Sequence, residues 1–321
     1  MLKYIISGVA MALLFIPQGF AETKYTTRPI SSFLFKELVP SPVSVKVMKV
    51  IDPLTFIGED KNIYALGGIE VPNAATSKAD ITEEAGKDLT RLIEGKELKL
   101  YLTKKKETGR LNRLNQNIVQ AEIKQGNIWV QGEMLALGLA RVRTTPSNPE
   151  LSAEMLKLET DARDKKLGLW SKDDLKILSP SNATGKENSF QIIEGKPLSA
   201  AVTRNMIFLN FAEDYKKDFT LGIPTKLRTS FAKRGINPLQ FAHTPLRVRG
   251  WLQSYNGPFI EIDHPEQIEI LGKLSPLTSA MTSEPSPGPA GMRSINMPEA
   301  PKVAEPEAPQ PKAPLPPKTN D

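Results

Sequence analysis

The order of strand-like and helix-like runs between residues 43 and 171 is the feature that most limits how this chain can fold. Short apolar or alternating runs, which favour strands, occur at 43–47, 55–57, 63–69, 97–102 and 118–123. Residues 82–93 carry apolar residues at helical spacing and acidic residues in the first turn, so a helix is expected before the fourth strand. Two more helices are expected at 130–137 and 151–166. This order predicts a mainly β domain with helices packed on its sheet.

Several stretches of this region share a recognisable pattern of apolar residues, glycine and proline. Residues 51–55 read Ile-Asp-Pro-Leu-Thr, and residues 64–73 read Tyr-Ala-Leu-Gly-Gly-Ile-Glu-Val-Pro-Asn. Together with 129–142 and 162–170, they resemble the staphylococcal-nuclease-like (thermonuclease) family. Its usual pattern is Ile-Asp-Gly-Asp-Thr followed by Arg-Leu-x-Gly-Ile-Asp-x-Pro-Glu. The resemblance covers about 43–171 and implies a five-stranded OB-type barrel with packed helices.

The resemblance also implies where such a nuclease would carry its metal ligands, general base and phosphate-binding arginines. These five positions fall here on Leu54, Ala65, Glu70, Asn73 and Gln116. Leu54 and Glu70 replace metal-binding aspartates, Ala65 and Gln116 replace arginines, and Asn73 replaces the glutamate base. An amide cannot take a proton from water, and calcium usually needs several carboxylates. Glu70 and Asp52 are therefore weak metal candidates, and no catalytic residue is assigned.

Basic residues gather between the fourth and fifth expected strands. The candidate phosphate-binding residues are Lys104, Lys105, Lys106, Arg110 and Arg113, with Tyr64 as a candidate stacking residue. The alternatives are an ordinary solvated loop and a core position for Tyr64. A second alignment, with Thr-Gly-Arg-Leu at 108–111, would put a catalytic arginine at Arg110. Arg141 and Arg143, after a strand, are expected on the surface.

Segments outside this region have their own composition. Residues 1–21 have a basic start, an apolar stretch at 5–16 and small residues before position 22, which predicts a signal peptide. We therefore expect a periplasmic or secreted bacterial protein with no membrane-spanning segment after cleavage. Residues 22–42 are expected to be an extended lead-in to the domain at 43–172. Residues 273–321 are rich in proline and are expected to be disordered.

A second domain is expected at 190–272, after a polar linker at 173–189. It contains strand-like runs at 207–211, 219–223, 246–252 and 259–262, with a helical stretch at 227–234. The stretches 247–252, 256–258 and 264–268 resemble an OB-like C-terminal module that follows nuclease-like domains in some secreted alphaproteobacterial proteins. That resemblance implies a second small β domain and no particular activity.

Composition narrows the possible functions. The chain has no cysteine, so disulfides and thiolate metal sites are excluded, and its net charge of +6 permits a polyanionic partner without requiring one. We therefore expect an exported, catalytically inactive binding module for nucleic acid or an envelope protein, with no cofactor. The alternative is a residual calcium-dependent phosphodiesterase of the thermonuclease type, cleaving DNA or RNA. The sequence leaves the oligomeric state open.

Overall fold

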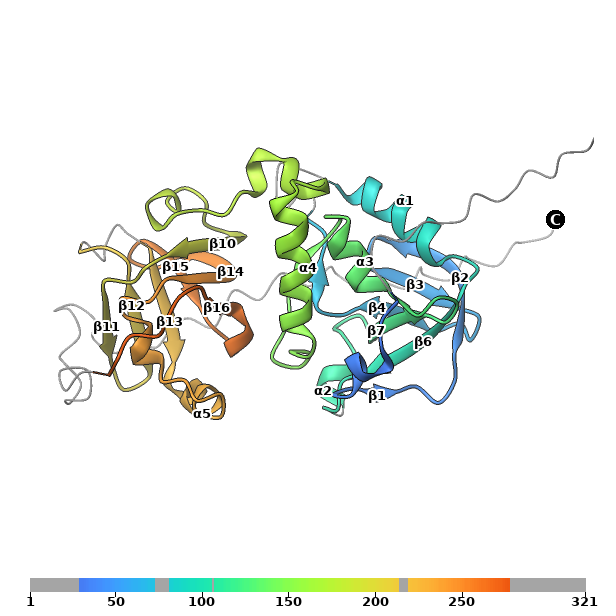
Figure 1. The fold of residues 1–321 in the computed structure, drawn as a ribbon, viewed down its shortest axis with the longest axis horizontal. Helices are drawn as coiled ribbons and strands as arrows, with labels where there is room; N and C mark the ends of the chain where they lie inside the picture. The colour runs from blue at the N-terminus through green and yellow to red at the C-terminus, as the bar shows by residue number, and fades with distance from the viewer. Residues whose placement is uncertain (1–28, 73–80, 106, 214–218, 278–321) are drawn as a thin grey trace, which may run out of the picture.

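The computed structural model describes residues 29–72, 81–105, 107–213 and 219–277. The expected signal peptide and almost all of the proline-rich tail lie outside these residues, as do Asn73 and Lys106. Two mainly β domains lie side by side, with helix α4 (Ser152–Asp164) between them (Figure 1). Within the described ranges, no helix has the length and apolar character needed to cross a membrane.

The first domain is a closed five-stranded barrel, as the sequence predicted. Its strands are β2 (Val45–Asp52), β3 (Thr55–Gly58), β4 (Ile63–Leu66), β6 (Glu97–Leu102) and β7 (Asn117–Ile123). Strand β6 pairs with both β2 and β7, which closes the sheet. Strands β4 and β7 run parallel, and the other neighbours in the barrel run antiparallel. The barrel and the helices packed on it share one hydrophobic core.

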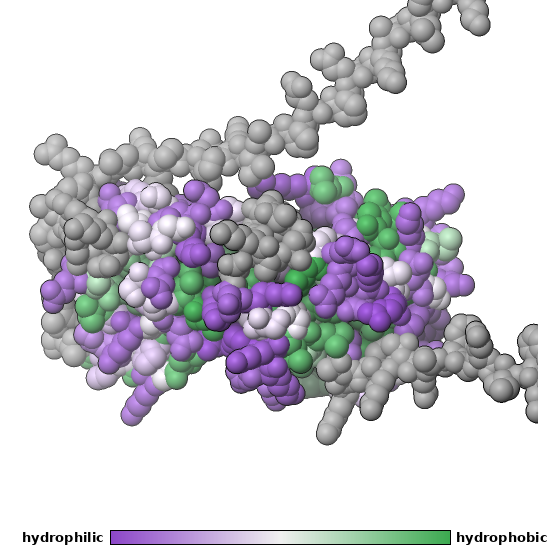
Figure 2. All heavy atoms as spheres, turned by 90° about the horizontal axis from the view of Figure 1, so that it is seen from above, coloured by the Kyte–Doolittle hydropathy of each residue, from purple (hydrophilic) through white to green (hydrophobic). Residues whose placement is uncertain are grey.

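Helices and short strands cover this barrel. Helix α1 (Thr82–Ile93) has the bounds expected from the sequence and buries Ala85, Leu89, Leu92 and Ile93. The remaining elements of the first domain are β8 (Ile128–Trp129), α3 (Val130–Ala136), α2 (Glu107–Arg110) and the two-stranded sheet of β5 (Ile69–Glu70) with β9 (Arg141–Val142). The face seen in Figure 2 is mostly hydrophilic where it is not grey, with hydrophobic side chains in small separate areas.

The segment before the barrel differs from the extended lead-in that we expected. Residues 32–35 form a 3-10 turn, η1 (Ser32–Phe35), and β1 (Val39–Pro40) pairs with β6. Phe35 is buried, and its ring centroid lies 4.0 Å from that of Tyr101. The segment therefore packs on the barrel through its few apolar side chains. The polar composition of residues 22–42 did not indicate this packing.

The second domain is a seven-stranded sheet. Its strands are β10 (Ser189–Gly195), β11 (Ser199–Val202), β12 (Met206–Asn210), β13 (Thr220–Pro224), β14 (Leu246–Ser254), β15 (Pro258–Glu261) and β16 (Ile268–Ile270). Strands β12 to β15 correspond to the four expected runs, and helix α5 (Arg228–Ala232) falls within the expected helical stretch. Strand β10 was not expected. It buries Phe190 and Ile192 as well as Ile193, so it shows no simple alternation.

Short 3-10 helices complete the fold: η2 (Gly168–Ser171), η3 (Asp173–Leu175), η4 (Pro180–Asn182), η5 (Thr225–Leu227), η6 (Pro238–Phe241) and η7 (Pro265–Gln267).

Apolar packing joins the two domains. A separate hydrophobic cluster joins Trp170 and Ala162 of the first domain with Phe190 and Ile192 of β10. Leu175, within the expected linker, is buried in the same cluster. The linker region thus contributes to an interface between the domains.

Candidate functional site

Glu70 is the one acidic residue at the five family positions, and it is buried in ion pairs. Only 8% of the residue is exposed. Arg141 Nε donates to Glu70 Oε1 at 2.6 Å, and Arg143 Nη1 pairs with Glu70 Oε2. Both carboxylate oxygens therefore face guanidinium groups, which compete directly with any metal ion for the same lone pairs.

Strand pairing explains how these arginines reach Glu70. Glu70 of β5 lies opposite Arg141 of β9 in the antiparallel register, and Arg143 is two residues further along. The guanidinium carbon of Arg141 lies 4.6 Å from the ring centroid of Phe190 in the second domain. Burial lowers the pKa of Arg141, and Glu70 opposes that shift. The prediction that Arg141 lies on the surface was wrong, whereas the Arg143 side chain is 47% exposed.

The turn between β2 and β3 uses Asp52 for its own hydrogen bonds. Asp52 Oδ1 accepts from the backbone N–H of Leu54 at 2.8 Å, and Oδ2 accepts from Thr55 Oγ1 at 2.6 Å. Leu54 is partly buried and packs against the barrel core. Within the described ranges, no group of three acidic or histidine side chains is placed to hold a metal ion. The residues present at this turn therefore do not fit a calcium ion.

Ala65 lies beside this turn, whereas Gln116 lies next to the other end of strand β4. Ala65 lies between Thr55 and Ile118 in the sheet register, and Gln116 directly precedes β7. Gln116 Oε1 accepts from Asn112 Nδ2 at 2.6 Å, so its side chain stabilises the turn at 112–116. The fold thus places Ala65 close to Leu54, with Gln116 further along the barrel. Asn73 lies outside the described residues, and Leu54, Ala65 and Gln116 carry no charge.

The basic loop, which we define as residues 103–116 between β6 and β7, carries the expected phosphate-binding side chains. Lys104 Nζ lies 3.8 Å from the carboxylate of Glu37, and Lys105 Nζ donates to the carbonyl of Pro146. Arg110 is only partly exposed, and its Nε donates to the Thr103 carbonyl at 3.3 Å. Lys104, Lys105 and Arg113 are exposed, so they are available to a phosphate.

Tyr64 does not offer a ring for base stacking, contrary to the prediction. It is 8% exposed, and its ring centroid lies 5.2 Å from that of Phe56 in the barrel core. Its hydroxyl donates to Asp60 Oδ2 at 2.5 Å. Burial and the nearby Asp60 carboxylate raise the pKa of Tyr64 to about 12. Tyr64 is therefore a core residue with a satisfied hydroxyl.

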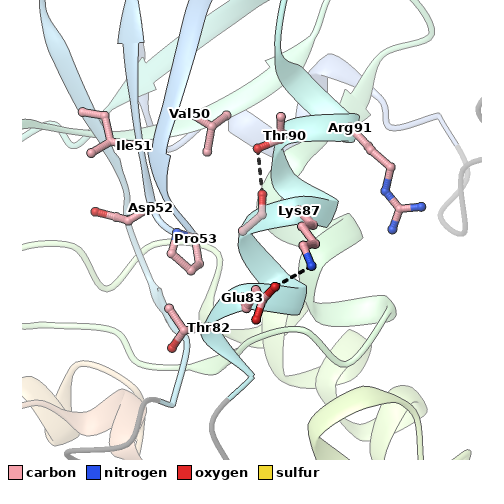
Figure 3. A pocket seen from close by; sticks show the side chains of 10 residues that line it. Val50, Ile51, Asp52, Pro53, Thr82, Glu83, Lys87, Thr90 and Arg91 are labelled. Atoms are coloured by element: carbon pink, nitrogen blue, oxygen red, sulfur yellow. Dashed lines mark hydrogen bonds and ion pairs between the residues drawn. The ribbon is translucent and has the colours of Figure 1, made fainter.

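A hollow of about 700 Å³ lies between the β2–β3 turn and helix α1 (Figure 3). No sequence pattern indicates this hollow, because it forms between elements that pack together only in the folded chain. Val50, Ile51 and Pro53 make one wall, and the Lys87 ammonium pairs with the Glu83 carboxylate on the opposite wall. Of the four family positions that the structure describes, none lines this hollow.

Comparisons with known proteins agree with the barrel. Residues 64–172, about a third of the chain, match the family model described as "Staphylococcal nuclease homologue". No curated protein matches the chain. The family match and the closed barrel together identify a staphylococcal-nuclease-like domain within this chain.

Proposed function

We propose that this protein binds single-stranded nucleic acid through its nuclease-like barrel and does not hydrolyse it. The observation that carries the proposal is the ion-paired state of Glu70 with Arg141 and Arg143. Phosphodiester cleavage with calcium needs carboxylates free to hold the ion, a base and cations at the reacting phosphate. Here the remaining carboxylate is neutralised, and the neighbouring positions carry an aliphatic group, a methyl group and an amide.

The position of the basic loop favours nucleic acid as the ligand. OB barrels bind oligonucleotides on the face of their second and third strands and with the loops beside it. In this barrel those elements are β3, β4, the turn at 52–55 and the basic loop. The exposed charges of Lys104, Lys105 and Arg113 supply contacts to phosphates. Since Tyr64 and Tyr101 are buried, we expect backbone contacts to dominate, with strong salt dependence and little sequence preference.

We further propose that the second domain is an OB-like module. Strands β10 and β11 are three residues apart and can be treated as one strand interrupted around Pro197. The sheet order then becomes the same as in the first barrel, with one parallel pair formed by β13 and β15. We also propose export to the periplasm or the exterior, on the basis of the signal-like residues 1–21.

Binding and cleavage can be measured together on the purified protein without its first 21 residues. Labelled single-stranded DNA and RNA are incubated with calcium or with a chelator, at increasing salt concentration. We expect binding that weakens with salt and oligonucleotides that remain intact in both conditions. Reversal of the loop charges in Lys104→Glu/Lys105→Glu/Arg113→Glu should weaken binding. The variant Lys172→Glu/Lys186→Glu/Lys196→Glu has the same change in net charge at exposed residues outside the loop and serves as a matched control.

Three outcomes would reject the proposal in different ways. Calcium-dependent cleavage by the native chain would support the alternative, a residual phosphodiesterase. Absence of binding at low salt, in a protein that unfolds cooperatively, would leave an envelope protein as the better candidate partner. Loss of affinity in the control variant equal to that of the loop variant would show that net charge alone is responsible.

A further inference from the structure

We propose that a bound nucleic-acid strand continues from the basic loop into a groove between the two domains, where Lys105 and Lys233 contact its phosphates. This inference rests on the proposed function and adds the second domain to the binding surface. The groove has a volume of about 310 Å³, and its walls include Lys105 and Pro146 from the first domain and Leu227, Lys233, Arg234 and His264 from the second. Helices α2 and α5, which are close in the chain to these lining residues, lie on the same side of the molecule in Figure 1.

Most of the exposed charge on this groove is positive. Lys105 and Lys233 are exposed, and Lys233 has no ion pair with any residue that the structure describes. Arg234 is also exposed, but it pairs with Glu266, whose side chain is only 8% exposed. Asp263 is the exposed acid of the groove, with its Oδ1 against His264 Nδ1. Phosphates are therefore attracted by the two lysines and repelled by Asp263.

The walls of the groove are held together by contacts between the domains. Thr144 Oγ1 lies 2.8 Å from His264 Nε2, directly behind the groove, and both residues are buried. Arg249 of the second domain also pairs with Glu159 of α4 at 3.0 Å. These contacts hold the two walls that carry Lys105 and Lys233 in place. Binding therefore does not require the walls to become ordered, which would reduce the affinity.

Lys105 belongs to both surfaces, which is why one strand can contact both. It lies in the basic loop and also lines the groove. An oligonucleotide of about 4 nucleotides fits within a single OB-sized site, whereas one of about 30 nucleotides is longer than the roughly 4–16 nucleotides that one OB fold contacts. The inference therefore predicts a dependence on oligonucleotide length that a site confined to the barrel does not.

The test compares Lys233→Glu, Lys105→Glu, Asp263→Asn and the control Lys186→Glu in the full two-domain protein. Lys233→Glu should weaken binding of the longer single strand about tenfold and reduce the slope of log K against log salt by about 0.7. It should leave the shorter strand unaffected. Asp263→Asn should tighten binding of the longer strand, because it removes the exposed negative charge. Lys186→Glu has the same charge change as Lys233→Glu and should alter affinity less than twofold.

Thermal unfolding of each variant establishes that the fold is unchanged. If Lys233→Glu binds the longer strand like the native chain, while reversal of Lys104 and Arg113 weakens it, the strand stays on the barrel. The inference is then wrong and the proposed function stands. If the native chain binds neither strand at low salt, both are wrong. An effect of Lys233→Glu that is the same for both strand lengths would also contradict the inference.

Discussion

Arg249 and Glu159 form a two-point ion pair across the boundary between the two domains. Arg249 Nη1 lies 3.0 Å from Glu159 Oε2, and Nη2 lies 3.0 Å from Oε1. Both side chains are at most 1% exposed. Burial disfavours the charged guanidinium, but Glu159 and Glu269 outweigh this, and the pKa of Arg249 is raised. A pair of this kind stabilises little compared with apolar packing, but it is costly to break on one side.

Arg249→Met should therefore destabilise the protein strongly. It leaves Glu159 buried with Arg163, at 3.2 Å, as its remaining cationic partner. We expect the free energy of unfolding to fall by about 3–5 kcal/mol, measured by urea denaturation. The double variant Arg249→Met/Glu159→Met should lose less than the sum of the two single variants, because no unpaired charge remains. A loss below about 1 kcal/mol in the single variant would contradict the role of this pair.

Tyr64 should make stability fall at alkaline pH. Its pKa rises from 10.0 to about 12 on folding, so above pH 10 the unfolded state loses its proton first. The contribution is complete below pH 10 and is lost as pH rises through about 12. In Tyr64→Phe, the plot of the free energy of unfolding against pH should be less steep in this range. In absorbance titrations, the tyrosinate signal that develops at the highest pH should disappear. An unchanged slope would show that Tyr64 ionises as in the unfolded chain.

Calcium should not stabilise the native protein. Because Glu70 is held by Arg141 and Arg143, we expect the same midpoint of thermal unfolding with calcium and with chelator. Restoring the family residues by Leu54→Asp, Ala65→Arg, Asn73→Glu and Gln116→Arg should give weak calcium binding in calorimetry. Adding Arg143→Ala should strengthen it, since one competing cation is removed. Tight calcium binding by the native chain would refute this account.

Gly138→Ala should destabilise the end of helix α3. Gly138 has φ +70°, and an added Cβ would meet the backbone of Leu167 and Gly168. Gly95 has a similar φ of +75° but has nothing within 4 Å of an added Cβ. We expect Gly95→Ala to cost about 1–2 kcal/mol from the backbone conformation alone. Gly138→Ala should cost clearly more in the same urea denaturation experiment, and equal losses would show that the backbone contact is unimportant.

Local patterns predicted most of the first domain. The strands and helix α1 follow from side-chain periodicity, which requires only neighbouring residues along the chain. Strand β10 was missed because Ile192 and Ile193 are both buried, which interrupts the alternation of buried and more exposed residues after only four positions. The 3-10 turn at 32–35 was missed because residues 22–42 were interpreted from their polar residues and prolines, although Phe33-Leu34-Phe35 is an apolar run within them.

The residues of the candidate site also fall into those that the sequence alone explains and those that only the structure explains. Side-chain identity alone determined that Leu54, Ala65 and Gln116 cannot hold calcium or clamp a phosphate, because those abilities depend on ionised groups that these residues lack. Only the tertiary structure decided that the Glu70 carboxylate is paired with arginines, since Arg141 lies 71 residues away in the chain. It also placed Tyr64 in the core and joined the domains through Arg249 and Glu159, 90 residues apart. Such contacts depend on how distant segments pack, and no local pattern encodes that.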